Sequence, residues 1–318
     1  MTKTKCFELV NKVVKAVSKF IVGYERNIEL MLITMLSRGH VLILGYPGSA
    51  KTLTTKLVAE ALGLCFRRIQ MTSDLLPTDI IGTKIIEPKT GDLRTVKGPI
   101  FANIVLVDEI NRGNPKTQAA LLEAMQEYQV TIEGETYRLP QPFMVIATLN
   151  PIETQGIFPL PQAQLDRFTV SLDFRYPNVN EEVEILTRDH INKGLEPRLK
   201  PICNINEVVN AIDEASSIYV DNAIIKYIVN IVNKLRKLED VSLGPSPRAS
   251  VSVLRVAKAI AATRGRDYVT PDDVKYVAPF VLRHRIQLRR SLGINLWEQV
   301  LESEEKIMKV LETEATPW

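Results

Sequence analysis

Eight residues at positions 45–52, Gly-Tyr-Pro-Gly-Ser-Ala-Lys-Thr, constrain the fold more than any other part of the sequence. They follow a short apolar run at 41–44 and precede a helical pattern at 52–62. Glycines between a buried strand and a helix let backbone N–H groups turn toward a phosphate, and the helix N-terminus adds partial positive charge. The segment therefore predicts a P-loop, a strand–loop–helix unit that binds a nucleoside triphosphate.

Within this loop, each residue type has an expected role. Lys51 would contact the β- and γ-phosphate oxygens, and Thr52 would ligate Mg²⁺. Glycine usually precedes the lysine, but this chain has Ala50. A methyl group is tolerated there if the helix has already begun, so we expect a negative φ at Ala50 and an N–H that faces the phosphates. The other residues expected to line the nucleotide are Tyr46, Pro47, Gly48, Ser49 and Leu53.

Further short apolar runs alternate with helical patterns in the first half of the chain. They occupy residues 66–70, 104–107, 143–149 and 168–174. Strands separated by helices, such as the one predicted at 115–128, indicate a parallel sheet with helices on both faces. Residues 79–100 and 130–142 contain turn signals between extended segments, and we interpret both as β-hairpins inserted into this α/β unit.

After Pro177 the pattern changes to helices only. Six candidate helices follow, at 181–191, 205–217, 221–238, 247–264, 271–285 and 295–313, and Thr270 followed by Pro271 is a good helix start. We therefore predict an α/β domain at residues 1–177 and an all-helical domain at residues 178–318.

The first residues also have a helical pattern. One side of the predicted helix carries Phe7, Val10, Val14, Val17 and Phe20 or Ile21. The segment lacks the continuous apolar core of a signal peptide, and no run reaches the ~18 apolar residues of a membrane span. Three scattered cysteines fit reduced thiols and no zinc site. We expect a cytoplasmic protein.

Two acidic residues follow the apolar run at 104–107, in the pattern called Walker B. Asp108 would hold Mg²⁺ through water, and Glu109 would polarise the attacking water. Solvated acids at a strand end would give the same pattern. Their position downstream of a P-loop favours the catalytic interpretation.

Three polar residues further along are candidates for contacts with the γ-phosphate. Asn150 ends a predicted strand and could position the attacking water, although asparagine before proline also forms turns. Arg167 could complete the site of a neighbouring subunit, or pair with Asp166 on the surface. Arg248 starts a helix, where the dipole disfavours a cation unless it has a special role, with a structural pairing as the alternative. Arg112 could couple the nucleotide state to a neighbouring subunit or to a hairpin, or it could be a surface residue without such a role, and the sequence favours neither.

Taken in order, these features resemble the AAA+ ATPases, and most closely the MoxR family. The matching segments are GYPGSAKT, VLVDEINRGNPKTQAALLEAMQE, ATLNPIETQGIFPLPQAQLDRF, GPSPRAS and VLRHRI, within residues 22–286. In that family alanine before the lysine is usual. The resemblance implies a five-stranded sheet of order 5-1-4-3-2, a helical lid, and a ring of subunits, commonly a hexamer.

The resemblance also implies roles for single residues. Asn150 matches the sensor 1 asparagine, Arg167 the arginine finger and Arg248 the sensor 2 arginine. Val22, Gly23 and Tyr24 match the segment that covers adenine, although a glutamine often stands where this chain has Tyr24. Residues 283–285, Arg-His-Arg, match a basic lid helix, and we assign them no chemistry.

Members of the family are chaperone-like ATPases that mature protein clients, often with a partner that has a von Willebrand factor A domain. Three alternatives remain: a magnesium-chelatase-like motor subunit, a nucleic-acid motor, and a nucleotide switch that does not hydrolyse ATP. The net charge of only +3, from 40 basic and 37 acidic residues, disfavours a nucleic-acid partner. The expected cofactors are ATP and Mg²⁺.

Overall fold

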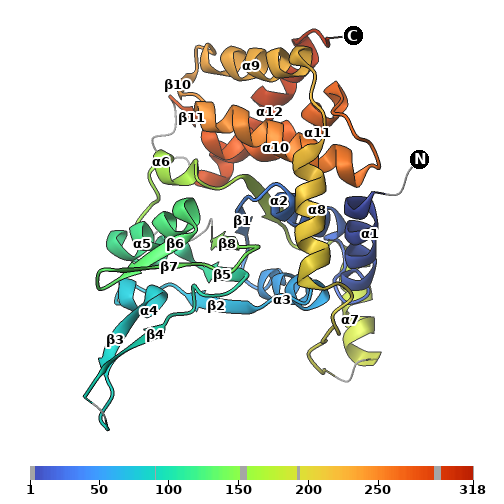
Figure 1. The fold of residues 1–318 in the computed structure, drawn as a ribbon. Coiled ribbons are helices and arrows are strands. Elements are labelled where there is room, and N and C mark those ends of the chain that lie inside the picture. The colour runs from blue at the N-terminus through green and yellow to red at the C-terminus, as the bar shows by residue number, and fades with distance from the viewer. Residues whose placement is uncertain (1–3, 90, 151–155, 192–193, 290–294, 318) are drawn as a thin grey trace.

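A five-stranded parallel sheet forms the centre of the N-terminal half of the computed structural model, which describes residues 4–89, 91–150, 156–191, 194–289 and 295–317 (Figure 1). The strands lie in the order β9-β1-β8-β5-β2. Counted one to five along the chain, this order is 5-1-4-3-2, as predicted. Their bounds are β1 Val41–Gly45, β2 Phe66–Gln70, β5 Ile104–Asp108, β8 Met144–Leu149 and β9 Val170–Phe174.

Both faces of the sheet are buried, as expected for parallel strands. Along β1, Val41 and Ile43 belong to one apolar cluster, whereas Leu42 and Leu44 belong to another, because successive side chains point to opposite faces. Helices α1, α2 and α3 contribute to the first cluster, and α5 contributes to the second. These helices are α1 Lys5–Val17, α2 Glu25–Leu36, α3 Lys51–Ala61 and α5 Pro115–Glu127.

Two antiparallel hairpins confirm the predicted insertions. One consists of β3 Gly82–Ile86 and β4 Leu93–Lys97 after the short helix α4 Pro77–Ile81, and the other of β6 Gln129–Ile132 and β7 Glu135–Arg138. The first hairpin extends away from the body of the molecule (Figure 1). Thr95 Oγ1 lies 3.0 Å from the hydroxyl of Tyr137, and Thr83 Oγ1 donates to Glu133. The two hairpins are therefore bonded to one another.

Residues beyond β9 are mainly helical, as predicted. A capping box starts α11: Asp273 is fully buried and accepts hydrogen bonds from the N–H and hydroxyl of Thr270 and from Arg264 and Arg266. The elements are α7 Val179–Ile191, α8 Ile205–Ser217, α9 Asn222–Arg236, α10 Pro247–Thr263, α11 Pro271–Leu282 and α12 Leu296–Thr313, with a small sheet of β10 Val241–Leu243 and β11 Gln287–Leu288. A short α6, Gln162–Leu165, precedes β9.

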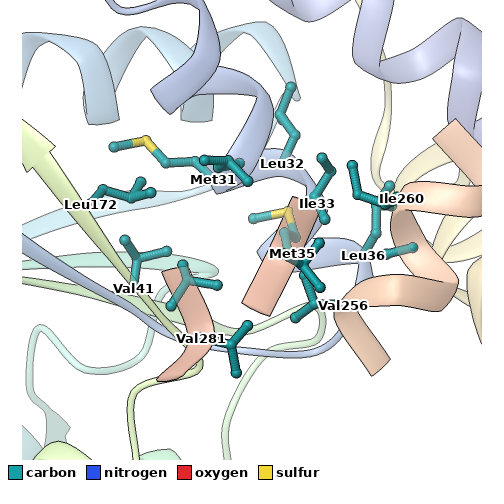
Figure 2. Close-up of a cluster of buried hydrophobic side chains, with 14 of the residues drawn as sticks. Met31, Leu32, Ile33, Met35, Leu36, Val41, Leu172, Val256, Ile260 and Val281 are labelled. Atoms are coloured by element: carbon teal, nitrogen blue, oxygen red, sulfur yellow. The ribbon is translucent and has the colours of Figure 1, made fainter. Parts of the chain in front are cut away.

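Helix α2 was not predicted from the sequence. Its apolar residues lie on all sides, so the pattern has no amphipathic period, and a helix of that kind is a buried one. Figure 2 shows its side chains between the sheet residues Val41 and Leu172 and the α10 residues Val256 and Ile260. Helix α2 thus joins the sheet to the C-terminal helices, and the division at residue 177 stays a prediction.

The predicted apolar face of the first helix was partly wrong. Helix α1 buries Cys6, Leu9, Val10, Val13 and Val17, whereas Phe7 is exposed. The buried stripe is rotated because α1 packs against α2, α8 and α10 together rather than against one surface. Within the described residues, no helix is both long and apolar enough to cross a membrane.

The basic segment after α11 is buried and structural. Helix α11 ends at Leu282, and Arg283–Arg285 form the 3₁₀ turn η2. Arg283 pairs with Asp173 at 2.6 Å and with Glu304 at 2.7 Å, and Arg285 donates to the carbonyl of Phe168. These charged groups fasten the C-terminal helices to strand β9, since buried guanidinium groups require such partners.

Candidate nucleotide-binding site

The P-loop connects β1 to α3, as predicted, but with a different backbone at Ala50. Gly48 has a φ of 78° and Ala50 a φ of 56°, and α3 begins at Lys51. The expectation of a negative φ at Ala50 was therefore wrong. Helix α3 starts at Lys51, one residue before the predicted start at Thr52, but Ala50 is not yet helical: it is the left-handed N-cap residue. A left-handed conformation costs an alanine about 1–2 kcal/mol. This strain accompanies the change of direction between the loop and the start of α3.

Lys51 folds back over the loop. Its Nζ donates to the carbonyl oxygens of Gly45 at 2.9 Å and Tyr46 at 2.6 Å. Burial lowers the pKa of Lys51, and the charges of Asp108 and Glu109 partly oppose that shift. The lysine thus lies within electrostatic reach of both acidic residues, at the edge of the sheet where β1, β8 and β5 all have their carboxyl ends.

Asp108 is the last residue of β5 and is 6% exposed. Its Oδ1 accepts from the hydroxyl of Thr148 at 3.2 Å, and its Oδ2 accepts from Arg68 Nε at 2.6 Å. The carboxylate therefore already binds a cation, which shows that this position attracts positive charge. Together with Thr52, the second residue of α3, Asp108 provides oxygen donors of the kind that Mg²⁺ prefers. These two residues fit the expected metal.

Glu109 lies directly after the strand with a φ of 55°. Its N–H donates to Thr148 Oγ1, and its carboxylate accepts from Gln70 at 2.8 Å and pairs with Arg112 at 3.1 Å. Arg112 therefore has a local role, because it holds the carboxylate of Glu109. Sequence reasoning assigned no role to Arg68, Gln70 or Thr148. The clue that could have identified Gln70 is its place in the sheet, because it pairs in register with Asp108 on the neighbouring strand.

Asn150 follows β8 and is buried. Strand β8 lies between β1 and β5 and runs parallel to both, so Asn150 emerges at the same edge as the P-loop and the Walker B acids. A role for Asn150 beside the Walker B acids requires β8 and β5 to be neighbouring strands, and they are. Residues 151–155, part of the matching segment after Asn150, lie outside the described residues.

The segment expected to cover adenine borders a hollow of about 520 Å³, lined also by Asn178 and Glu181. Gly23 has a φ of 79°, and a side chain there would meet the Glu181 carboxylate. Tyr24 stacks on Phe174 at 4.5 Å, and its hydroxyl donates to the carbonyl of Arg175. Burial and the charge of Glu181 raise the pKa of Tyr24 to about 12. Val22 is buried beside them.

Aromatic stacking also fixes the start of the P-loop. Tyr46 lies parallel to Tyr176, with ring centroids 4.7 Å apart, and is tilted against Trp297 of α12. The loop, the segment after β9 and the last helix therefore meet at one place. The other predicted loop residues differ in burial: Ser49 is buried, Pro47 and Gly48 are exposed, and Leu53 is half-buried.

Arg167 and Arg248 lie together, but not at this edge of the sheet. Both line a hollow of about 440 Å³ with His40 and Thr169, which precede β1 and β9. Residues that precede parallel strands lie at the amino edge, whereas Lys51 follows β1. Five strand residues separate the two edges by roughly 16 Å. Within one chain, the two arginines are therefore remote from the P-loop.

The position of these arginines has a clear local cause. Asp166 pairs with the buried Arg285 at 2.9 Å and accepts from Ser246, the N-cap residue of α10, at 2.7 Å. This contact brings the start of α10 against the residue next to Arg167. The alternative in which Arg167 pairs with Asp166 is disfavoured, because other groups occupy both carboxylate oxygens. Arg167 Nε is buried without a hydrogen-bond partner among the described residues.

Comparison with known proteins agrees with this geometry. A family described as "ATPase family associated with various cellular activities (AAA)" matches residues 40–170, and an "AAA lid domain" matches residues 233–306. Chaperone MoxR1 of Mycobacterium tuberculosis is 43% identical over 310 residues, which cover 95% of this chain and 80% of that protein. This chain belongs to the MoxR family of AAA+ ATPases. It is an ATP-hydrolysing P-loop enzyme.

Two further relatives support the assignment across nearly the whole length. The uncharacterized protein YeaC of Bacillus subtilis is 44% identical over 280 residues, covering 88% of this chain and 87% of that protein. A crystal structure of a protein from Cytophaga hutchinsonii, assigned there as an ATPase, superimposes with a TM-score of 0.85 at 38% identity and covers 96% of both chains.

Proposed function

We propose that this MoxR-family protein works as a ring of identical subunits that couples Mg-ATP hydrolysis to the remodelling or maturation of protein clients. One observation supports the ring arrangement. The phosphate-binding and acidic residues lie at the carboxyl edge of the sheet, and Arg167 and Arg248 lie at the amino edge. A complete site then needs the carboxyl edge of one subunit and the amino edge of the next.

In this proposal, each subunit binds its own nucleotide through the residues that follow β1. Lys51 would exchange its bonds to the loop carbonyls for the β- and γ-phosphate oxygens, and Thr52 and Asp108 would hold the metal. Bound Mg²⁺ would neutralise charge on the phosphates. Glu109 orients the attacking water once its carboxylate is released from Gln70 and Arg112, and Asn150 fixes the position of that water.

The neighbouring subunit supplies the arginines. Arg167 is half-buried at the wall of the hollow, and Asp166 is already paired with Arg285 and Ser246, which leaves the guanidinium available to a phosphate of the next subunit. Arg248 lies beside Arg167 at the first turn of α10, where it would face the same γ-phosphate. Because the two contributing edges differ, the contact is heterologous, and such contacts form a ring when the rotation between subunits closes. We propose that the ring contains six subunits.

The client role rests on the family. MoxR1, the relative from Mycobacterium tuberculosis, is named a chaperone. In this chain, the β3–β4 hairpin presents exposed apolar side chains, including Ile86 and Leu93, which could contact an unfolded segment or a partner with a von Willebrand factor A domain. The helical domain proposed for residues 178–318 would act as the lid.

A trapped ring tests this function. Glu109→Gln should bind ATP without hydrolysing it and retain its client, whereas Lys51→Ala should bind neither. Proteins that copurify with the first variant in an ATP-dependent manner, and then raise the ATPase rate of the unmodified enzyme, would support the proposal. A large chelatase subunit would favour the chelatase alternative. Stimulation by DNA with a steep loss in salt would favour the nucleic-acid motor.

A further inference from the structure

Three aromatic rings meet where the phosphate loop leaves strand β1. Tyr46, the first residue after β1, stacks on Tyr176 with the ring centroids 4.7 Å apart and the planes 3° from parallel. Trp297 of α12 packs against the same tyrosine at 5.6 Å, tilted by 33°. The register of the sheet explains the first contact, because Gly45 of β1 pairs with Phe174 of β9 and the chain continues beyond both strand ends side by side. Residues from three distant parts of the sequence thus converge at the start of the loop.

The backbone of Tyr46 also orients polar groups of the loop. Its carbonyl oxygen accepts from Lys51 Nζ at 2.6 Å and from the hydroxyl of Ser49 at 2.7 Å. A shift of the Tyr46 peptide would therefore move the lysine that is expected to contact phosphate. The two neighbouring rings hold the residue on whose carbonyl this part of the loop is organised.

Trp297 belongs to a helix that is fastened to the sheet. Val300, three residues further along α12, is buried in an apolar cluster on one face of the sheet. Glu304, two turns beyond the tryptophan, pairs with the buried Arg283 at 2.7 Å, and Arg283 pairs with Asp173 of β9 at 2.6 Å. Helix α12 is therefore anchored to the strand that leads to Tyr176, and its position sets where the tryptophan ring lies.

Tyr176 keeps 62% of its surface exposed, although its ring stacks on Tyr46. A side chain so exposed contributes little to the apolar core. Its contact with Tyr46 therefore constrains the loop without being important for folding. Removal of this ring should affect the loop more than the stability of the whole chain.

We propose that Tyr176 and Trp297 are positioning residues for triphosphate binding, which act by holding Tyr46 and with it the phosphate loop. A loop that is ordered before the ligand arrives avoids part of the entropy cost of binding. Without the rings, only a fraction of the molecules would have the competent loop, and the affinity would fall by that fraction. This role rests on the proposed function of residues 45–52 as the phosphate loop and is independent of the ring of subunits.

A direct contact between a ring and the base is the alternative. Tyr176 lines the hollow of about 520 Å³ that the segment expected to cover adenine also borders, and its second face is free of Tyr46. Within the part of the chain that the structure describes, the lining of that hollow includes neither Tyr46 nor Trp297. A base in the hollow therefore gives no role to Trp297, whereas positioning of the loop requires all three rings.

Calorimetric titration with two ligands separates these roles. The Glu109→Gln protein, which prevents turnover, is titrated with Mg-ATP and with inorganic tripolyphosphate in Mg²⁺, which has the phosphates but no base. Tyr46→Leu, Tyr176→Leu and Trp297→Leu should each weaken the binding of both ligands by about two- to tenfold, the range for loss of one aromatic contact. Tyr219→Leu removes a ring of similar exposure, 63%, from the connection between α8 and α9, and should leave both affinities unchanged.

Combined variants show whether the two rings act through Tyr46. Adding Tyr176→Leu or Trp297→Leu to Tyr46→Leu should cause no further loss of affinity, because the ring that they hold is already absent. Tyr176→Phe and Trp297→Phe keep an aromatic ring and should restore most of the affinity. Thermal unfolding without ligand confirms that each variant is folded at the temperature of the titration.

The other outcomes are equally specific. A loss for ATP without a loss for tripolyphosphate would place the rings against the base and overturn the positioning role. Unchanged affinities in Tyr176→Leu and Trp297→Leu, or losses that add to that of Tyr46→Leu, would also overturn it while leaving the phosphate loop intact. Binding of both ligands that persists in Lys51→Ala would instead contradict the proposed function of the loop itself.

Discussion

His40 offers a quantitative test of how the sheet is joined to the helix that follows Walker B. Its ring is fully buried at the start of β1. Nδ1 accepts from the N–H of Val145 at 3.0 Å, so Nε2 carries the proton and donates to the carbonyl of Met125 at 2.9 Å. The imidazole thus ties β1 to β8 and to the end of α5, and it must be neutral to do so.

Burial lowers the pKa of His40 from its ordinary value of 6.5 to about 4, and the hydrogen bond to Met125 partly opposes the shift. Because the folded pKa is the lower one, protonation favours the unfolded chain. The contribution is complete above about pH 6.5 and is lost as the pH falls toward 4. Linkage between these two values gives a loss of about 2 kcal/mol between pH 7.5 and pH 5.

Urea unfolding of the native protein and His40→Gln at about pH 7.5, 6 and 5 measures this loss. The variant should be less stable by about 1–3 kcal/mol at the highest pH, since it disturbs two buried hydrogen bonds. That difference should shrink by about 2 kcal/mol at pH 5, because the glutamine does not titrate. Other titrating groups, His284 included, are common to both proteins. A pH-independent difference would refute the assignment of a buried neutral imidazole.

Two further predictions concern single backbone and side-chain features. Ala50→Gly should stabilise the protein by about 0.5–1 kcal/mol, because glycine relieves the left-handed strain at the start of α3, and thermal unfolding measures it. Destabilisation would show that Ala50 is not left-handed in solution. Asp273→Ala should cost about 3–5 kcal/mol in chemical denaturation, because Arg264 and Arg266 lose their buried partner. Thr270→Ala, which removes only part of the cap, should cost about 1 kcal/mol; equal losses would contradict the role given to Asp273.

The sequence predicted features that depend on local patterns. The five strands, both hairpins and the helix start at Thr270 each have a period or a local signal within a few residues. Helix α2 has no such signal, because burial on all sides removes the period. The backbone of Ala50 was mispredicted since the start of α3 depends on how the loop leaves β1. Arg68 and Gln70 acquire their partners only through the pairing of β2 with β5.

The relative placement of the two arginines was also beyond sequence reasoning. The motif suggested a finger at Arg167 and a sensor at Arg248, but their meeting in one hollow depends on the bond between Asp166 and Ser246, which are 80 residues apart. Only the fold shows that this hollow lies at the amino edge of the sheet. That separation is the basis for assigning the active site to an interface.

Mixed rings test the interface most directly. Arg167→Ala and Glu109→Gln should each be inactive alone, because every site then lacks one required group. Mixing the two folded variants should restore ATP hydrolysis, since about a quarter of randomly formed interfaces combine an intact Glu109 with a neighbour's intact Arg167. A mixture that assembles but remains as inactive as its components would contradict a site shared between subunits.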